Sequence, residues 1–321
     1  MRERLVFCDL DTLETNYLSE FISQGRVPQN LFYLLNGATA FYSYRNDDLA
    51  QIAWEDEYRF FKEQEFWRKD LRIAFVSLGC GNAGPEKMLL RQMQADGYQL
   101  HYVGVDSSES MLELAAENLN EDTYRQSFVL ADFSDPAFAG QLHEVVQEDH
   151  VRVFAMIGGT FGNFDQMHVA GLLENLVPPR DYLYLDVVPT QPTEHQNAKL
   201  RMRLSHLPDN LSGFFDRLLG ALGLSRELGE ILREERSDGA LETLRFTFSF
   251  RATERIQLSC LDVEMVLEPG QTVELFTIRA YEPASLAAFM AERQFELVDT
   301  YAPDVGNLSH RWQRLLFSRA G

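Results

Sequence analysis

Residues 73–87 read Ile-Ala-Phe-Val-Ser-Leu-Gly-Cys-Gly-Asn-Ala-Gly-Pro-Glu-Lys, and this stretch decides the fold. Its first six residues predict a buried strand. Three glycines follow as Gly79-x-Gly81-x-x-Gly84, and Pro85 then suits the first turn of a helix, where its missing N–H costs nothing. Glycines let a backbone approach a ligand, and a helix N-terminus offers free N–H groups to polar atoms. The stretch therefore predicts a strand, a cofactor loop and a helix, with a purely structural glycine turn as the alternative.

The next predicted strand ends in an acidic residue. It covers Tyr102–Val105 and is followed by Asp106-Ser107-Ser108. Asp106 lies roughly 20 residues beyond Gly84, the spacing at which a carboxylate accepts hydrogen bonds from the ribose hydroxyls of a bound nucleoside. The alternative is a helix N-cap, which Ser107 or Ser108 could provide equally well. We assign Asp106, with Ser107 beside it, to cofactor binding.

The third predicted strand, Ser127–Leu130, also leads into an acid. Asp132 could accept a hydrogen bond from an adenine amino group, and the ring of Phe133 could lie beside the base. An ordinary strand-ending Asp next to a core Phe explains the same residues equally well. Both a dinucleotide and S-adenosylmethionine fit these motifs, because either ligand lays a ribose against the same strand ends.

Strands and helices alternate on both sides of these motifs, which is typical of parallel strands joined by crossover helices. The predicted strands are Ile73–Leu78, Tyr102–Val105, Ser127–Leu130, Val151–Ile157 and Tyr182–Val188. Several are apolar on both faces, as a sheet covered by helices requires. The pattern predicts an α/β protein with a doubly wound sheet, whose core covers residues 71–190.

The regions that flank this core differ from it. Residues 1–70 are aromatic-rich and predict a helical segment, whereas residues 191–278 predict an inserted α+β lobe. That lobe would hold a helix around Leu211–Leu219 and an antiparallel meander of three strand-like runs between Leu241 and Ile278. Residues 279–321 would return to the core with a helix and two strands, at Pro283–Glu292, Phe295–Tyr301 and Trp312–Ser318.

The fourth predicted strand runs into Gly158-Gly-Thr-Phe-Gly-Asn163-Phe. Together with the Gly79 loop, the stretch GVDSSESML at 104–112 and Ala131-Asp132-Phe133, this segment resembles the S-adenosylmethionine-dependent histidine-specific methyltransferases, which trimethylate the α-amino group of histidine. The family places a helical N-terminal segment before its core and inserts a second lobe after the fifth strand. The resemblance therefore implies a class I methyltransferase, Rossmann-like doubly wound sheet with a second α+β lobe formed by the N-terminal segment and the insertion.

The resemblance also implies a role for each motif. The implied cofactor contacts are Gly79 and Gly81 for the methionine part, Asp106 and Ser107 for the ribose, Asp132 and Phe133 for the adenine, and Gly158 at the fourth strand end. Asn163 would contact the acceptor, and Tyr33 weakly resembles the N-terminal wall of the family's substrate site. Asn163 and Tyr33 are thus the predicted catalytic residues, with a turn residue and a buried structural aromatic as their respective alternatives.

One pair of positions departs from the family. The family holds a Glu and a Ser on the strand before its last helix, where they grip the histidine side chain, and an ungapped comparison puts Phe276 and Ile278 there. Apolar residues cannot make those hydrogen bonds, so the pocket would discriminate poorly in favour of an imidazole. The acceptor is therefore expected to be a different amine, a carboxylate or a more apolar small molecule.

Composition excludes several classes of function. Lys and Arg number 29 against 49 Asp and Glu, a net charge of −20 that repels nucleic-acid phosphates. No apolar stretch approaches the roughly 20 residues that span a bilayer, so we expect neither membrane nor nucleic-acid partners. The three cysteines show no paired or zinc-type spacing, which predicts a reducing, cytoplasmic location and no metal. The oligomeric state stays open and is compatible with a monomer.

The predicted function is methyl transfer from S-adenosylmethionine to a small molecule, at the amine nitrogen of an amino acid or related metabolite. Two alternatives share the same motifs. A nicotinamide-dependent oxidoreductase would use the same glycine loop and acid, and a non-catalytic protein of the same fold would bind S-adenosylmethionine without turnover. Motifs of serine hydrolases, zinc peptidases and P-loop enzymes are absent from the sequence.

Overall fold

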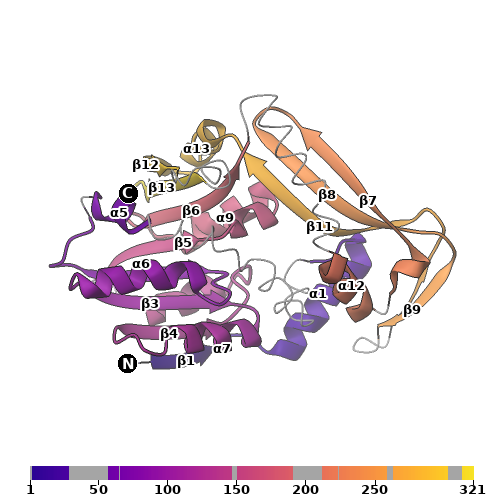
Figure 1. The fold of residues 1–321 in the computed structure, drawn as a ribbon, viewed down its shortest axis with the longest axis horizontal. Helices are drawn as coiled ribbons and strands as arrows, with labels where there is room; N and C mark the ends of the chain where they lie inside the picture. The colour runs from indigo at the N-terminus through magenta and orange to yellow at the C-terminus, as the bar shows by residue number, and fades with distance from the viewer. Residues whose placement is uncertain are drawn as a thin grey trace. The chain divides into compact units, whose positions relative to one another are not determined.

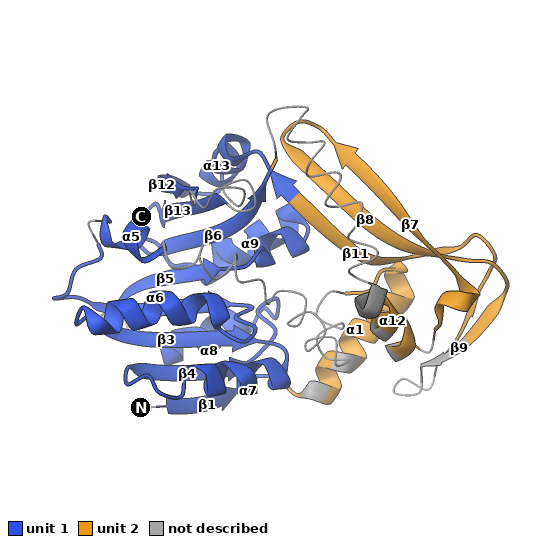
Figure 2. Cartoon of the chain, in the orientation of Figure 1, with its two compact units in different colours: residues 1–8, 47–189, 280–321 blue, residues 9–46, 190–279 orange. Residues whose placement is uncertain are grey.

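A computed structural model describes residues 2–28, 57–64, 66–146, 150–190, 212–222, 224–258, 263–302 and 313–321. The chain divides into two compact units (Figure 2). Unit 1 comprises Met1–Cys8, Asp47–Pro189 and Ala280–Gly321, and unit 2 comprises Asp9–Asn46 and Thr190–Arg279. Unit 2 therefore combines an N-terminal segment with an insertion, as the predicted fold class requires.

Unit 1 is built on a mostly parallel sheet whose described strands follow the order β1-β4-β3-β2-β5-β6-β13-β12 (Figure 1). The strand bounds are β1 Arg2–Val6, β2 Arg72–Leu78, β3 Gln99–Asp106, β4 Arg125–Leu130, β5 Val151–Met156, β6 Tyr182–Pro189, β12 Phe295–Tyr301 and β13 Gln313–Arg319. Strand β13 is antiparallel to both of its neighbours. The mixed α/β class and the doubly wound core predicted from the sequence are confirmed.

The strand order reverses at β2, because β3 and β4 lie on one side of it and β5 and β6 on the other. Right-handed crossovers place the helices that precede and follow such a reversal on opposite faces of the sheet. The helices of unit 1 are α5 Glu57–Lys62, α6 Gly84–Ala95, α7 Glu109–Asn118, α8 Phe138–Val145, α9 Gln166–Leu176 and α13 Pro283–Ala291. Figure 1 shows α6 and α7 side by side in front of the sheet.

The apolar runs of the central strands explain this layering. Every residue of β2 after Arg72 is buried, and so is every residue of β3 after Gln99. A strand with two buried faces needs cover from both sides, and the amphipathic helices provide it. In α6, Leu89, Leu90 and Met93 form the buried face.

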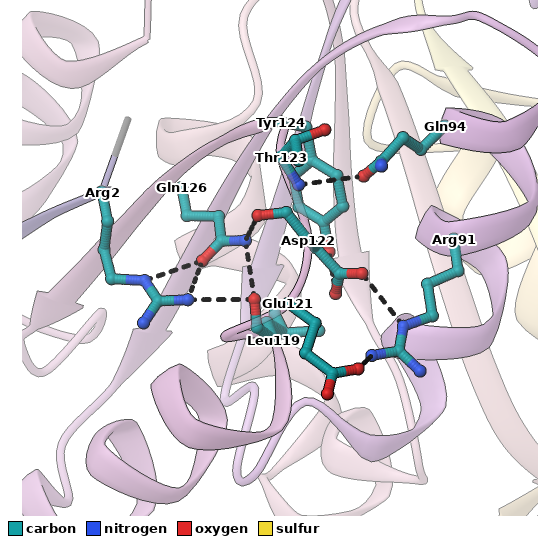
Figure 3. A network of polar contacts seen from close by, with 9 residues as sticks. All are labelled: Arg2, Arg91, Gln94, Leu119, Glu121, Asp122, Thr123, Tyr124 and Gln126. Atoms are coloured by element: carbon teal, nitrogen blue, oxygen red, sulfur yellow. Dashed lines mark hydrogen bonds and ion pairs between the residues drawn. The ribbon is translucent and has the colours of Figure 1, made fainter.

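Strand β1 corrects the expectation that the N-terminus is helical from its start. Its sequence Arg-Glu-Arg-Leu-Val carries too many charges to predict a strand, yet it pairs in parallel with β4. Its charged side chains bind residues near and on β4. Arg2 donates to Oε1 of the buried Gln126 from Nε at 3.0 Å and from Nη2 at 2.9 Å. Nη2 of Arg2 also donates to the carbonyl of Leu119 at 2.9 Å (Figure 3). Arg125 of β4 likewise pairs with Glu3 at 2.9 Å.

Unit 2 packs helices with antiparallel strands. Its described elements are α1 Leu10–Gln24, α12 Ser212–Ala221, the 3₁₀ turn η3 Arg226–Leu228, β7 Gly229–Ser237, β8 Leu241–Phe250, β9 Glu254–Leu258, β10 Val263–Leu267 and β11 Thr272–Tyr281, of which the last two residues belong to unit 1. Helix α1 ends at Gly25, whose φ of 61° is the left-handed value that favours glycine. The ring of Phe215 on α12 lies 5.3 Å from that of Phe246 on β8.

The predicted meander is wrong in its connections. The run after residue 254 forms two strands, β9 and β10, which pair with each other in a sheet of their own. Strand β8 instead neighbours β11 and the unpredicted β7. β7 was missed because its second half, Arg-Glu-Glu-Arg-Ser, is polar and is exposed from Glu234 onward. In the part of the chain that the structure describes, no helix has the length and apolar character needed to cross a membrane.

Candidate functional site

The candidate site lies at the carboxyl ends of the unit 1 strands, next to the point where the strand order reverses. Strand β2 lies between β3 and β5, and the chain leaves β2 and β5 to opposite sides. Ligands of doubly wound sheets bind in the crevice outside such a switch point, because the two loops diverge there. The loop after β2 and the turn after β5 therefore form the two walls of the candidate site.

The loop after β2 is held tightly against β3. The amides of Gly79 and Cys80 both donate to the carbonyl of Val105, at 2.8 and 3.0 Å. Gly79 and Gly81 have φ of 70° and 53°, and Ala83 has 54°. Alternating left-handed residues bend the chain sharply into α6, which begins at Gly84 with a proline in its first turn as predicted.

The two loop glycines have different surroundings. A Cβ on Gly79 would come within 2.9 Å of Cγ2 of Thr160 and 3.9 Å of a ring carbon of Phe133, so this residue seals the loop against the ends of β4 and β5. A Cβ on Gly81 would meet no described atom within 4 Å. Gly81 thus exposes its backbone to open space, as a loop that receives a ligand must.

Below the loop, Glu86 at the start of α6 is buried and accepts a 2.5 Å hydrogen bond from the Ser77 hydroxyl on β2. A carboxylate in the first turn of a helix is favoured by the helix dipole. This bond fixes the helix start against the strand that feeds the loop. Neither residue was among those predicted for the site.

Asp106 stands at the end of β3 and binds the loop directly. Its Oδ2 accepts from the Gly81 amide and its Oδ1 from the Ser108 amide, both at 2.9 Å. Burial raises the pKa of Asp106 to about 6, and the hydrogen bonds from the backbone amides of Ser108, Gly81 and Ser107 oppose that rise. A carboxylate has roughly four acceptor positions, so the three amide donors leave about one for a hydroxyl group of a ligand.

The neighbouring serines separate capping from binding. Ser108 is the N-cap of α7, where its hydroxyl accepts from the Met111 amide at 3.4 Å. The N-cap of α7 is therefore Ser108 and not Asp106. Ser107, assigned to the cofactor, is half-buried, and its amide is one of the donors that support the Asp106 carboxylate.

The end of β4 brings Asp132 and Phe133 to the same edge. Oδ1 of Asp132 accepts from the amide (2.8 Å) and the hydroxyl (2.6 Å) of Ser134, which closes a local turn. Phe133 is nearly buried, and its ring meets that of Phe164 edge-on with centroids 5.3 Å apart. The turn from Asp132 to Ser134 is what the purely structural alternative predicts. The same segment also places the Phe133 ring, with Asp132 next to it in the chain, beside the Gly79 loop.

The turn after β5 forms the second wall. Gly158 and Gly159 both have left-handed φ, at 75° and 82°, and lead into the 3₁₀ turn η2 Thr160–Asn163. Thr160 anchors the turn by donating to the Ile157 carbonyl at 2.9 Å. Asn163 ends η2 and is half-buried.

Three charged residues beneath this turn were missed from the sequence. The Gly158 amide donates to Oδ2 of Asp186 on β6 at 2.9 Å. Asp186, Arg314 of β13 and Glu57 of α5 are each fully buried, and Arg314 Nε lies 2.9 Å from Glu57 Oε1 and 3.7 Å from Asp186 Oδ1. The sequence did carry a sign of them, because Asp186 and Arg314 are charged residues in otherwise apolar strands. A charge buried in such a strand needs a partner of opposite charge.

Of the predicted site residues, the structure brings Gly79, Gly81, Asp106 and Phe133 into one assembly. Contacts with Thr160 connect this assembly to the turn that carries Gly158 and Asn163. Tyr33 lies outside the described residues. Phe276 and Ile278 are half-buried on one face of β11, while Thr277 on the other face is buried. In the described segments, no three His, Cys, Asp or Glu side chains are grouped as a metal site would need.

The sequence matches one protein family over the same region. The family described as "Histidine-specific methyltransferase, SAM-dependent" matches residues 25–185, which include the glycine loop, Asp106, Asp132 and the turn after β5. No curated protein matches the chain significantly.

Several solved structures are similar at low sequence identity. A S-adenosylmethionine-dependent methyltransferase from Clostridium acetobutylicum is 11% identical, with 84% of this chain and 92% of that chain covered and a TM-score of 0.42. A glycopeptide N-methyltransferase in complex with sinefungin is 14% identical, with 83% and 87% covered and a TM-score of 0.45. The Burkholderia thailandensis 1,6-didemethyltoxoflavin-N1-methyltransferase is 9% identical, with 96% and 88% covered and a TM-score of 0.44.

Proposed function

Because the chain belongs to the family of histidine-specific, S-adenosylmethionine-dependent methyltransferases, we propose that it methylates an amine nitrogen of an amino acid or a related small metabolite. The enzyme class and the cofactor follow from the family. The acceptor is the proposal. The observation that carries it is the joining of the Gly79–Gly84 loop, Asp106 and the Gly158–Asn163 turn at the switch point of the sheet.

The residues at this edge fit a nucleoside cofactor that ends in an amino acid. Asp106 lies at the end of β3 with an acceptor position left for a ribose hydroxyl. The open space beside Gly81 leaves room for a polar chain to lie along bare backbone. We assign the ribose to Asp106 and Ser107, the adenine to Asp132 and Phe133, and the methionine part to Gly79, Gly81 and Gly158.

S-adenosylmethionine, when bound, supplies an electrophilic methyl group on a sulfonium. The protein's part is then to hold the acceptor nitrogen in line with that methyl and to keep water away. An amine must be neutral to attack the methyl group, so its ammonium form must first give a proton to a nearby acceptor or to water. The side-chain amide of Asn163 both donates and accepts hydrogen bonds, which suits it to orient an amino or carboxyl group of the acceptor.

The character of β11 supports an acceptor that is less polar than histidine. Phe276 and Ile278 stand where the resemblance places the Glu and Ser that hold the imidazole, and both are half-buried on the same face. A ring nitrogen left without a partner there would lose several kcal/mol of binding relative to water. We therefore propose an amino acid or amine whose side chain is apolar or aromatic.

A thermal-shift screen tests this proposal. The protein is saturated with S-adenosylhomocysteine and scanned against the standard amino acids and their decarboxylated amines, and ligands that raise the melting temperature are then assayed for product with S-adenosylmethionine. We expect apolar or aromatic amines to stabilise the protein more than histidine does and to be methylated. Methylation of histidine in preference to all of them would contradict the assignment of Phe276 and Ile278.

The substitution Asn163→Ala tests whether Asn163 binds the acceptor or the cofactor. We expect it to lower kcat/KM for the acceptor about tenfold or more, because one hydrogen bond to the acceptor is lost, while leaving the affinity for S-adenosylhomocysteine within about twofold. Calorimetry with S-adenosylhomocysteine and steady-state kinetics measure the two quantities. Loss of affinity for S-adenosylhomocysteine with unchanged kcat/KM for the acceptor would show that Asn163 binds the cofactor instead.

A further inference from the structure

The buried charges below the β5 turn form a continuous path to it. Arg314 on β13 lies directly opposite Asp186 on β6 in the antiparallel register, so both side chains share one face of the sheet. Glu57 reaches the same guanidinium from α5 and also accepts a 3.1 Å hydrogen bond from the hydroxyl of Tyr184 on β6. All four residues belong to unit 1.

Asp186 uses its two oxygens for different partners. Oδ1 faces Arg314 at 3.7 Å, and Oδ2 accepts the Gly158 amide at 2.9 Å. The Gly158 amide is thereby engaged within the protein, and the direction of the peptide that opens the turn depends on the Asp186 carboxylate. Because η2 follows at once, the placement of Asn163 depends on the same bond.

Keeping these charges in the sheet is expensive. A buried carboxylate loses its hydration, and a buried ion pair is often no more stable than apolar residues of the same volume. Burial raises the pKa of Glu57 to about 7, with Arg314 opposing the rise and Asp186 adding to it. Apolar side chains would fill the same space at less cost, but none could accept the Gly158 amide.

We propose that Asp186 and Arg314 are positioning residues for methyl transfer, which set the Gly158–Asn163 turn against the Gly79 loop. Arg314 fixes the carboxylate of Asp186, and Asp186 fixes the turn. Neither residue is catalytic in the sense of touching the reacting atoms. The inference rests on the proposed function only in its kinetic consequence, since the geometry it describes exists whatever the acceptor is.

The chain contains a matched control for this cluster. Asp181, which immediately precedes β6, pairs with Arg152 of β5 at 2.7 Å, and both are largely buried. This pair joins the same two strands at their amino ends, away from the carboxyl edge. Asp181→Asn therefore weakens a buried carboxylate–guanidinium pair on β6 without touching the Gly158 turn.

The experiment compares Asp186→Asn with Asp181→Asn in the full-length enzyme. An Asn at 186 has one oxygen and one uncharged NH₂, so if the oxygen keeps the Gly158 bond, an NH₂ group faces the Arg314 guanidinium in place of the carboxylate charge that pairs with it. We expect Asp186→Asn to lower kcat at least tenfold with the best acceptor from the thermal-shift screen, and to raise the KM for S-adenosylmethionine by a smaller factor, because Gly158 is one of several residues assigned to the cofactor. Asp181→Asn should lower the melting temperature but keep both kinetic constants within twofold.

Hydrogen exchange makes the test independent of the acceptor. With S-adenosylhomocysteine bound, Asp186→Asn should speed exchange of the segment 157–164 at least tenfold, and Asp181→Asn should not change it. Equal exchange and equal kcat in the two variants would overturn the proposal. If Asp186→Asn does not fold, Arg314→Lys is held to the same criteria, and failure of both to fold would identify the cluster as a requirement of the fold and overturn the proposal too. An acceptor screen without hits, combined with the expected exchange, would count against the proposed function alone.

Discussion

Asp106 is a buried carboxylate with only 9% of its surface exposed. Burial raises its pKa to about 6, and the backbone amides of Ser108, Gly81 and Ser107 only partly compensate. A hydroxyl group of a cofactor can stabilise the ionised form with a further hydrogen bond. We therefore assign this buried charge to cofactor binding.

The affinity for the cofactor should depend on pH through Asp106. Ribose hydroxyls donate to the ionised form of Asp106, so binding should weaken once the carboxyl of the free enzyme is protonated below its pKa of about 6. We expect the Kd for S-adenosylhomocysteine to be constant above pH 7 and to rise about tenfold by pH 5. Calorimetry across this range measures it.

Asp106→Asn is the matched variant, because an Asn side chain does not titrate. It should bind more weakly at pH 7.5, by about 1 to 3 kcal/mol, and its Kd should barely change between pH 7 and pH 5. A wild-type Kd that stays flat over this range would show that Asp106 does not hold the ribose. Ala is a poorer choice here, since it would leave the amides of Gly81 and Ser108 without their acceptor.

Single residues were predictable where local chemistry alone determines them. Gly79 and Gly81 need left-handed backbone, and Asp106 ends a strand at a characteristic distance from them, so a linear pattern suffices. Asp186 and Arg314 are distant in sequence and meet only through the register of β6 and β13. No local pattern contains that register, and their only trace in the sequence is a charge within an apolar run.

Among the strands, hydrophobic pattern predicted β2 to β6 as well as β12 and β13, and failed at β1 and β7. Strands β2 to β6 have buried apolar runs and lie where they were expected. β1 and β7 are largely polar, so neither period nor apolar content reveals them. Such strands are stabilised by specific partners on a neighbouring strand, and those partners are known only after the pairing is known.

The attachment of β1 gives a prediction at this scale. Arg2→Ala removes the donors to Oε1 of Gln126, a buried residue, and to the Leu119 carbonyl. We expect the free energy of unfolding to fall by about 1 to 2 kcal/mol, because a buried acceptor is left without a partner. Urea denaturation measures this change.

Arg4→Ala on the same strand is the control. Arg4 pairs with Glu109, and both side chains are more than two-fifths exposed, so its loss should cost less than about 0.5 kcal/mol. Neither variant should alter cofactor affinity. Equal destabilisation by the two substitutions would mean that β1 is held by its backbone pairing with β4 alone.

At the scale of the whole molecule, charge is unevenly distributed between surface and interior. The chain has a net charge of −20 at neutral pH. Among the described residues of the interior, burial raises the pKa of Glu57 to about 7 and that of Asp106 and Asp181 to about 6. The buried base His101 has the opposite shift, since burial lowers its pKa to about 4.

The cofactor-free enzyme should therefore be more stable at pH 6 than at pH 8. A carboxyl whose pKa is higher in the folded than in the unfolded state adds stability as the pH falls through the folded value, and Glu57 does so across this interval. Weaker repulsion among surface carboxylates acts in the same direction only below about pH 5, so the buried groups dominate here. His101, neutral when folded, opposes them, but mainly below about pH 6.5.

Thermal unfolding without ligand, scanned from pH 5.5 to pH 8, tests this expectation. The melting temperature should decline toward pH 8, and Glu57→Gln should flatten the decline by removing the group that titrates near 7. A melting temperature that rises steadily through this range would show that Glu57 is ionised throughout in the folded enzyme.

The position of β13 has a consequence for how the protein is made. Residues 313–319 are synthesised after every other described strand of the sheet, yet they form a strand that pairs with both β6 and β12. Until they leave the ribosome, Glu57 and Asp186 lack the guanidinium of Arg314 that pairs with both. We expect the nascent chain to remain incompletely folded up to that moment, so that a chain stopped before Arg314 depends on chaperones.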